Sequence, residues 1–154
     1  MELAPDNPSS WQRVLEDIAC YPDNDVWRDW KIIARRFIEQ GIAIHLDYHF
    51  RAGQSMHHFI FSTLDHHGLH GDPHVTIAIP SEVKQSEIRI QVAYGTQSLW
   101  FSKPELSYTL DYDDGFNTFR RFLLELWTAT KSDAIPEDIR SPLAPFYAPT
   151  LPHV

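Results

Sequence analysis

The stretch Ile42-Ala43-Ile44-His45-Leu46-Asp47-Tyr48-His49-Phe50 decides the fold that this sequence predicts. Its apolar residues alternate with alanine, histidine and aspartate, which is the period of two that a half-buried β-strand requires. One face of such a strand would be apolar, and the other would carry His45, Asp47 and His49. We therefore expect a strand at residues 42–50, with helices covering its apolar face and the imidazoles facing water.

Two helices are predicted before this strand. The first has Ser9 or Ser10 as its N-cap, carries apolar residues three and four positions apart, and ends where Pro22 disfavours helix in the residue before it. The second begins at Asp25 and carries a broad apolar stripe. Gly41 is expected to end it as the left-handed residue that often follows a helix.

Several short strands and one more helix are predicted after residue 50. A turn at 52–54 leads to strands at 55–63, 75–79, 88–92, 99–101 and 107–110, with a loop at 65–73 and a helix from Asp114 to Lys131. Strands joined by short links pair antiparallel, because a parallel pair needs a long crossover. We expect a two-layer α+β domain: an antiparallel meander of four to six strands, covered on one face by two N-terminal helices and one C-terminal helix.

The composition changes after Lys131. Prolines recur from Pro136 to Pro152 and exclude helix or central strand there, yet apolar residues such as Ile139 and Phe146 lie among them. We expect a single α+β domain over residues 1–131. Residues 132–154 would form an extended Pro-rich strap that packs on the domain or on a second copy, which makes a homodimer a further expectation.

Charge and cysteine content exclude several classes of protein. The chain has 154 residues and a formal net charge of −8, which argues against gripping nucleic-acid phosphates by bulk charge. The single cysteine, Cys20, allows no internal disulfide and is typical of a reducing compartment. No apolar run reaches the roughly 20 residues of a membrane helix. We expect a cytoplasmic protein whose direct partners are neither membrane nor nucleic acid.

Carboxylates and tyrosines alternate in the segment from Tyr108 to Asp114. Tyrosine is enriched in protein interfaces, and acidic surfaces suit basic partners; the competing interpretation is a helix-capping loop. We expect a binding or inhibitor protein without a cofactor, comparable in size, charge and lack of catalytic motif to immunity proteins, antitoxins and anti-defence inhibitors. Its partner would be a basic protein, either a toxin or nucleic-acid-binding machinery. The predicted contact residues are Trp100, Tyr108, Asp111, Tyr112, Asp113 and Asp114.

Eight of the nine histidines lie between His45 and His74. Histidine is the commonest metal ligand and carries protons near neutral pH. The alternative function is therefore a histidine-dependent hydrolase or phosphodiesterase, with zinc as its cofactor. Against it, the spacing matches no zinc signature, and a solvated sheet face also needs polar side chains. The metal candidates are His45, Asp47, His49 and His58, and the catalytic candidates add His74 and Thr76 as an H-x-T element.

Overall fold

The computed structural model describes residues 6–55, 58–63, 72–80, 88–96, 106–131, 134–137 and 139. Their helices and strands are α1 (Asn7–Ala19), α2 (Arg28–Ala43), α3 (Leu46–His49), β1 (Arg51–Ser55), β2 (His58–Ser62), β3 (His74–Ala78), β4 (Ile90–Gly95), β5 (Leu106–Leu110) and α4 (Tyr112–Thr130). The predicted strand at 99–101 and most of the predicted strap lie outside these residues, and the domain division at residue 131 stays a prediction.

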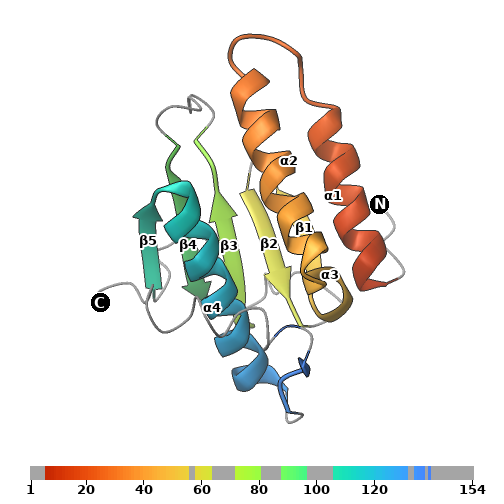
Figure 1. Ribbon diagram of the computed structural model, residues 1–154, viewed down its shortest axis with the longest axis vertical. Helices are drawn as coiled ribbons and strands as arrows, with labels where there is room; N and C mark the ends of the chain where they lie inside the picture. Colours follow the sequence, from red (N-terminus) through yellow and green to blue (C-terminus); the bar gives the residue numbers. More distant parts are fainter. Residues whose placement is uncertain are drawn as a thin grey trace.

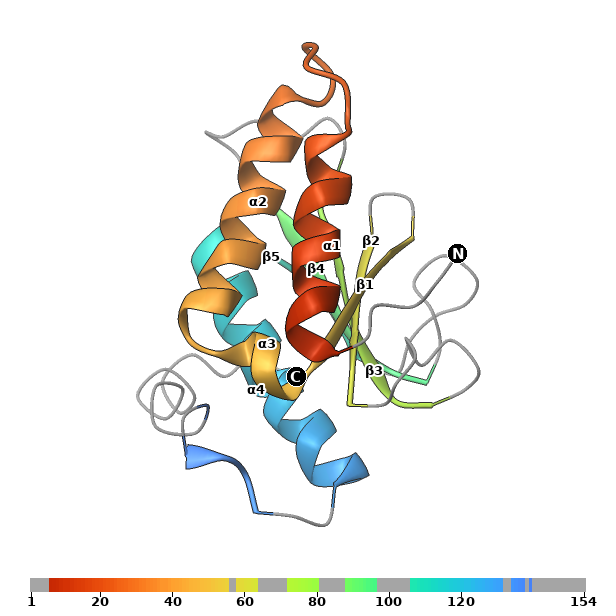
Figure 2. The same ribbon diagram turned by 90° about the vertical axis from the view of Figure 1, so that its right-hand side faces the viewer.

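The five strands form one antiparallel sheet in the order β1-β2-β3-β4-β5. Each strand pairs with its neighbour in sequence, so the sheet is a meander. Helices α1, α2 and α4 lie on one side of it (Figures 1 and 2). The predicted α+β class, the meander and its covering by helices from both ends of the chain are confirmed.

The hydrophobic core lies between these helices and one face of the sheet. Trp30 on α2 is fully buried, stacks on the Phe59 ring with centroids 5.8 Å apart, and donates from Nε1 to the Ile79 carbonyl oxygen at 3.0 Å. This one side chain therefore fastens α2 to β2 and to the end of β3. Other buried members of the core are Phe37, Phe61, Val75, Ile77, Val92, Phe119 and Ile139.

The predicted strand at 42–50 is wrong. Helix α2 continues to Ala43, His45 adopts the left-handed conformation with φ 67°, and residues 46–49 form the short helix α3. The His45 N–H donates to the Ile42 carbonyl oxygen at 3.0 Å, as the residue after a helix does in a left-handed cap. The alternating apolar residues at 42–50 therefore belong to the end of α2 and to the short helix α3. The last residue of this stretch, Phe50, is extended.

Gly41 lies inside α2 and does not end it. A Cβ atom built on Gly41 would lie 2.7 Å from Cζ3 of the buried Trp11 side chain. The glycine is needed for the close approach of α1 and α2, while His45 takes the left-handed position four residues later. Gly41 therefore serves close packing and not helix termination, so the predicted end of α2 at Gly41 is wrong.

Other predicted boundaries shift by a few residues. Residues 52–54 lie within β1 and form no turn, because β1 runs from 51 to 55 and pairs with β2 at 58–62. Helix α1 is capped by Asp6, whose carboxylate accepts from the Ser9 N–H at 2.8 Å, and not by Ser9 or Ser10. Helix α2 begins at Arg28, three residues after the predicted cap Asp25. In both helices most of the predicted apolar stripe is buried, but Val26, predicted in the second stripe, is exposed and precedes α2, and neither predicted N-cap is correct.

Side chains of α1 cover the start of the outer edge of β1. Ser10 Oγ accepts the Ala52 N–H at 2.9 Å, and Trp11 Nε1 donates to the Phe50 carbonyl oxygen at 2.8 Å. These backbone groups would otherwise be unpaired at a sheet edge, where they invite another strand. Helix α1 therefore satisfies the first backbone groups along this edge.

Candidate protein-binding surface

The predicted acidic segment joins β5 to α4. Asp111 is the N-cap of α4: its carboxylate accepts from the Asp114 N–H at 2.9 Å, and its carbonyl oxygen accepts from the Gly115 N–H at 2.8 Å. The predicted cap, Asp114, is wrong by three residues. Asp113 and Asp114 lie in the first turn, where the helix dipole favours negative charge.

The carboxylates of Asp111, Asp113 and Asp114, which we call the acidic turn, are held on a fixed backbone. All three residues are exposed. Salt bridges among the described residues include Arg28 to Asp25, Lys31 to Asp23 and Arg35 to Glu39, and none of these three neutralises the acidic turn. Exposed carboxylates on a helix end are available to a cationic partner.

Tyr112 fastens the acidic turn to the rest of the molecule. It is 6% exposed, its hydroxyl donates to Gln40 Oε1 at 2.8 Å, and the Arg36 guanidinium lies 3.9 Å from its ring centroid. Burial raises the pKa of the Tyr112 hydroxyl, and the nearby Arg36 charge offsets part of that rise. Tyr112 therefore connects α4 to α2 and offers little surface to a partner.

The other two aromatic candidates are Tyr108 and Trp100, and the structure describes only Tyr108. Tyr108, in β5, is half-buried, and its ring centroid lies 6.0 Å from that of Phe122 on α4. Its hydroxyl is buried and has no hydrogen-bond partner. Trp100 lies outside the described residues. A contact role for either residue stays a prediction.

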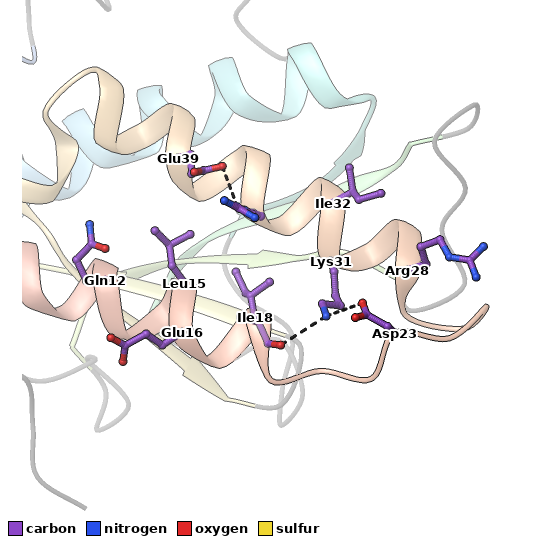
Figure 3. Close-up of a pocket in the computed structure, with 11 residues that line it drawn as sticks. Gln12, Leu15, Glu16, Ile18, Asp23, Arg28, Lys31, Ile32 and Glu39 are labelled. Atoms are coloured by element: carbon purple, nitrogen blue, oxygen red, sulfur yellow. Dashed lines mark hydrogen bonds and ion pairs between the residues drawn. The ribbon is translucent and has the colours of Figure 1, made fainter.

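A groove of about 560 Å³ lies elsewhere, between the outer faces of α1 and α2 (Figure 3). Leu15, Ile18 and Ile32 form its apolar part. Its three cations are already paired: Lys31, for example, bonds Asp23 at 2.8 Å and the Tyr21 carbonyl oxygen at 2.9 Å. Each cation of this groove thus has a carboxylate partner, whereas the carboxylates of the acidic turn have no salt-bridge partner among the described residues.

The structure does not place His45, Asp47 and His49 on a strand face. His45 is exposed and its ring stacks on that of Tyr48 at 5.6 Å, whereas His49 is half-buried with its ring 5.9 Å from that of Trp127. Asp47 is 7% exposed, and its Oδ1 has no hydrogen-bond partner among the described residues. The three side chains have different environments because a helical turn points them in different directions.

Burial raises the pKa of Asp47 above its ordinary value, with His45 and His49 acting in the opposite direction. The folded chain therefore holds this proton more tightly than the unfolded chain, so the protonated form favours folding. The contribution of Asp47 to folding stability is full below about pH 4, the pKa of an unfolded aspartate. It is lost as the pH rises through the raised pKa of the folded state.

Asp47→Asn should therefore stabilise the protein at neutral pH, since it removes a charge that burial disfavours. The gain over the unaltered protein should grow as pH rises from 4 to 7, as measured by urea unfolding at each pH. Asp17→Asn, at an exposed position on α1, is the control and should show no such trend. A constant or shrinking gain for Asp47→Asn would contradict the burial argument.

His58, His74 and Thr76 lie on the sheet face opposite the helices, because their neighbours Phe59, Val75 and Ile77 point into the core. His74 is 1% exposed; its Nδ1 bonds the Asp72 carbonyl oxygen at 2.8 Å, and its buried Nε2 has no hydrogen-bond partner in the part of the chain that the structure describes. His58 pairs with Ala78, four residues along β3 from His74. At about 3.3 Å per residue, the two histidines are about 13 Å apart along the strands.

No metal centre forms among the residues that the structure describes: they contain no group of three histidine, cysteine, aspartate or glutamate side chains that could hold an ion. The four metal candidates are divided between the α2–β1 connection and the far face of the sheet. The two histidines on that face are also too far apart to act on one phosphorus atom. The alternative residues therefore do not converge on one site within this part of the chain.

Comparisons of the chain with protein-family models, with curated proteins and with solved structures found no match. In the described residues, no helix has the length and apolar character needed to cross a bilayer.

Proposed function

We propose that this protein is an acidic binding protein that occupies a basic protein partner through the acidic turn and the neighbouring strand β5. The proposal rests chiefly on one observation: the exposed Asp113 and Asp114 carboxylates have no salt-bridge partner among the described residues, in a chain of net charge −8. Immunity proteins, antitoxins and anti-defence inhibitors are the classes that act in this way, and a cytosolic location fits them.

Charge would act mainly on the rate of association and on the choice of partner. A fixed acidic surface attracts a basic protein over several ångströms and rejects acidic ones, whereas buried aromatic and aliphatic contacts slow dissociation. Tyr108 and Trp100 are the proposed aromatic contacts. A toxin or a nucleic-acid-binding protein presents the required basic surface.

The triple variant Asp111→Asn, Asp113→Asn, Asp114→Asn tests this proposal. Asparagine at residue 111 keeps the helix cap, so the fold should be retained. We expect association with the partner captured from a host lysate to slow by about tenfold or more at low salt, with less dependence on ionic strength and a similar dissociation rate. Surface plasmon resonance at several salt concentrations measures all three quantities.

A second triple variant provides the matched control. Glu16→Gln, Asp17→Asn and Glu125→Gln remove the same number of negative charges from exposed positions on α1 and α4. This control should retain most of the association rate, because the removed charges lie outside the acidic turn. Equal slowing in both variants would show that only net charge matters, and an unchanged rate in the first would contradict the proposed surface.

A further inference from the structure

The two outer edges of the sheet differ in how their backbone groups are satisfied. At the outer edge of β1, Ser10 and Trp11 on α1 bond the Ala52 N–H and the Phe50 carbonyl oxygen. At the other edge, β5 pairs only with β4 among the described residues. Within this part of the chain, the β5 edge is therefore the one at which the sheet can be extended.

The register identifies the β5 residues whose backbone faces outward. Successive residues of a strand direct their N–H and C=O groups to opposite edges. The Ala52 N–H points outward to Ser10, so the N–H and C=O groups of Arg51 point inward, toward its partner Ser62 on β2. The pairing is uninterrupted across β2, β3 and β4, so the direction of each residue's backbone groups follows from the register. On β5, residues 106, 108 and 110 face β4, and the outward residues are Ser107 and Thr109.

The two outward residues are also accessible. Ser107 and Thr109 are exposed, whereas residues 106, 108 and 110 are half-buried. Each outward residue offers one N–H and one C=O, so two residues present four backbone groups along the edge. This is the arrangement that an added strand uses when an extended peptide joins a sheet.

We infer that the β5 edge binds an extended basic segment of the partner as a sixth strand of the sheet. This inference rests on the proposed function and specifies how the partner is held. Asp111 follows Leu110 directly, so the acidic turn lies at the end of the same edge. Lysine or arginine at one end of the added segment would meet Asp113 and Asp114, while its backbone pairs with Ser107 and Thr109.

Charge favours a basic segment over a second copy of this chain. Two copies each carry a net charge of −8, and pairing β5 with β5 would bring two acidic turns to the same interface. Like charges at an interface disfavour association, whereas opposite charges speed it. A homodimer through this edge is therefore one of the results that would overturn the inference.

Amide hydrogen exchange of the full-length protein tests the edge directly. In the free protein, the Ser107 and Thr109 amides should exchange quickly and the Tyr108 amide slowly. The probe is an end-blocked twelve-residue peptide that alternates lysine with valine and threonine, and the control peptide has glutamate in place of lysine. The lysine peptide should slow exchange at Ser107 and Thr109 by tenfold or more, and the glutamate peptide should not.

Variants at Thr109 separate backbone pairing from side-chain contact. Thr109→Pro removes an outward N–H and leaves the pairing with β4, because proline is tolerated where an edge N–H faces solvent. Thr109→Val keeps the N–H and the strand preference. We expect the proline variant to bind the lysine peptide at least tenfold more weakly and the valine variant to bind it unchanged. Exchange in the unaltered protein decides the matter if the proline variant does not fold.

The outcomes distinguish this inference from the proposed function. Slowed exchange at Ser107 and Thr109 with the lysine peptide supports both. Peptide-induced NMR shifts at Asp113 and Asp114 without slowed exchange at the edge overturn strand addition and leave the acidic surface standing. No response at either place contradicts both. Slow exchange at Ser107 and Thr109 in the free protein overturns the inference. If the slow exchange is independent of protein concentration, the edge is closed within the chain. If it depends on concentration, a second copy of the chain covers the edge.

Discussion

Trp11→Ala should lower the free energy of unfolding by about 3–5 kcal/mol, the usual range for truncating a large buried aromatic residue. Trp11 is fully buried, and its ring centroid lies 5.1 Å from that of Phe61. Truncation would leave a cavity between α1, α2 and the sheet. It would also remove the donor to the buried Phe50 carbonyl oxygen, which adds the cost of an unpaired polar group.

Urea unfolding followed by circular dichroism measures this loss. A domain of ordinary stability, about 5–15 kcal/mol, would lose a substantial part of it. The same truncation at Trp27, which is only half-buried, is the control and should cost clearly less. A loss below about 1 kcal/mol at Trp11 would mean that this side chain does not join α1 to the sheet as described.

Gly41→Ala should destabilise the protein by about 1–3 kcal/mol, the usual cost of overpacking. Alanine normally stabilises a helix relative to glycine by about 1 kcal/mol. Here the added Cβ would lie 2.7 Å from Cζ3 and 3.0 Å from Cη2 of Trp11, and the buried indole has no room to turn away. The local clash should therefore exceed the gain in helix propensity.

A double-mutant cycle with Trp11→Phe tests the cause. Phenylalanine lacks the outer indole ring to which Cζ3 and Cη2 belong, so Gly41→Ala should cost less in that background. The expected coupling free energy lies within about 0.5–3 kcal/mol, the range for residues in contact. Additive losses, again from urea unfolding, would place the strain elsewhere.

Periodicity was sufficient to predict the layers of this fold. The stripes of α1, α2 and α4 and the alternation in β4 arise from packing one face of each element against the core, which is a local requirement. The meander follows from the short connections. The fold class therefore survived the failure of the strand predicted at 42–50, because the other strands form the sheet without it.

The failure at 42–50 has a physical cause. Ile44 is the C-cap of α2 and Leu46 begins α3, so the alternation joins residues from two helices across a left-handed turn. Gly41 gave a false end to α2 because its function is to approach Trp11, a contact between distant segments. Sequence spacing alone cannot distinguish a glycine required for packing from one required for a turn.

The candidate surface was predictable in charge but not in detail. The acidic segment was identified from composition, and its carboxylates are exposed. Tyr112 was expected at the surface, but the cap at Asp111 begins α4 three residues earlier and turns Tyr112 toward Gln40. The outward direction of Ser107 and Thr109 depends on the register of five strands and on Ser10 across the sheet, which no local pattern contains.

The position of α1 along β1 has a consequence for assembly size. A sheet with two open edges can accept a strand on each and propagate into a fibre, since every added molecule presents a new open edge. A strand that arrives at the β1 edge meets α1, which already bonds the Ala52 N–H. The proposed strand pairing at β5 would therefore stop after a single addition and give a self-limiting 1:1 complex.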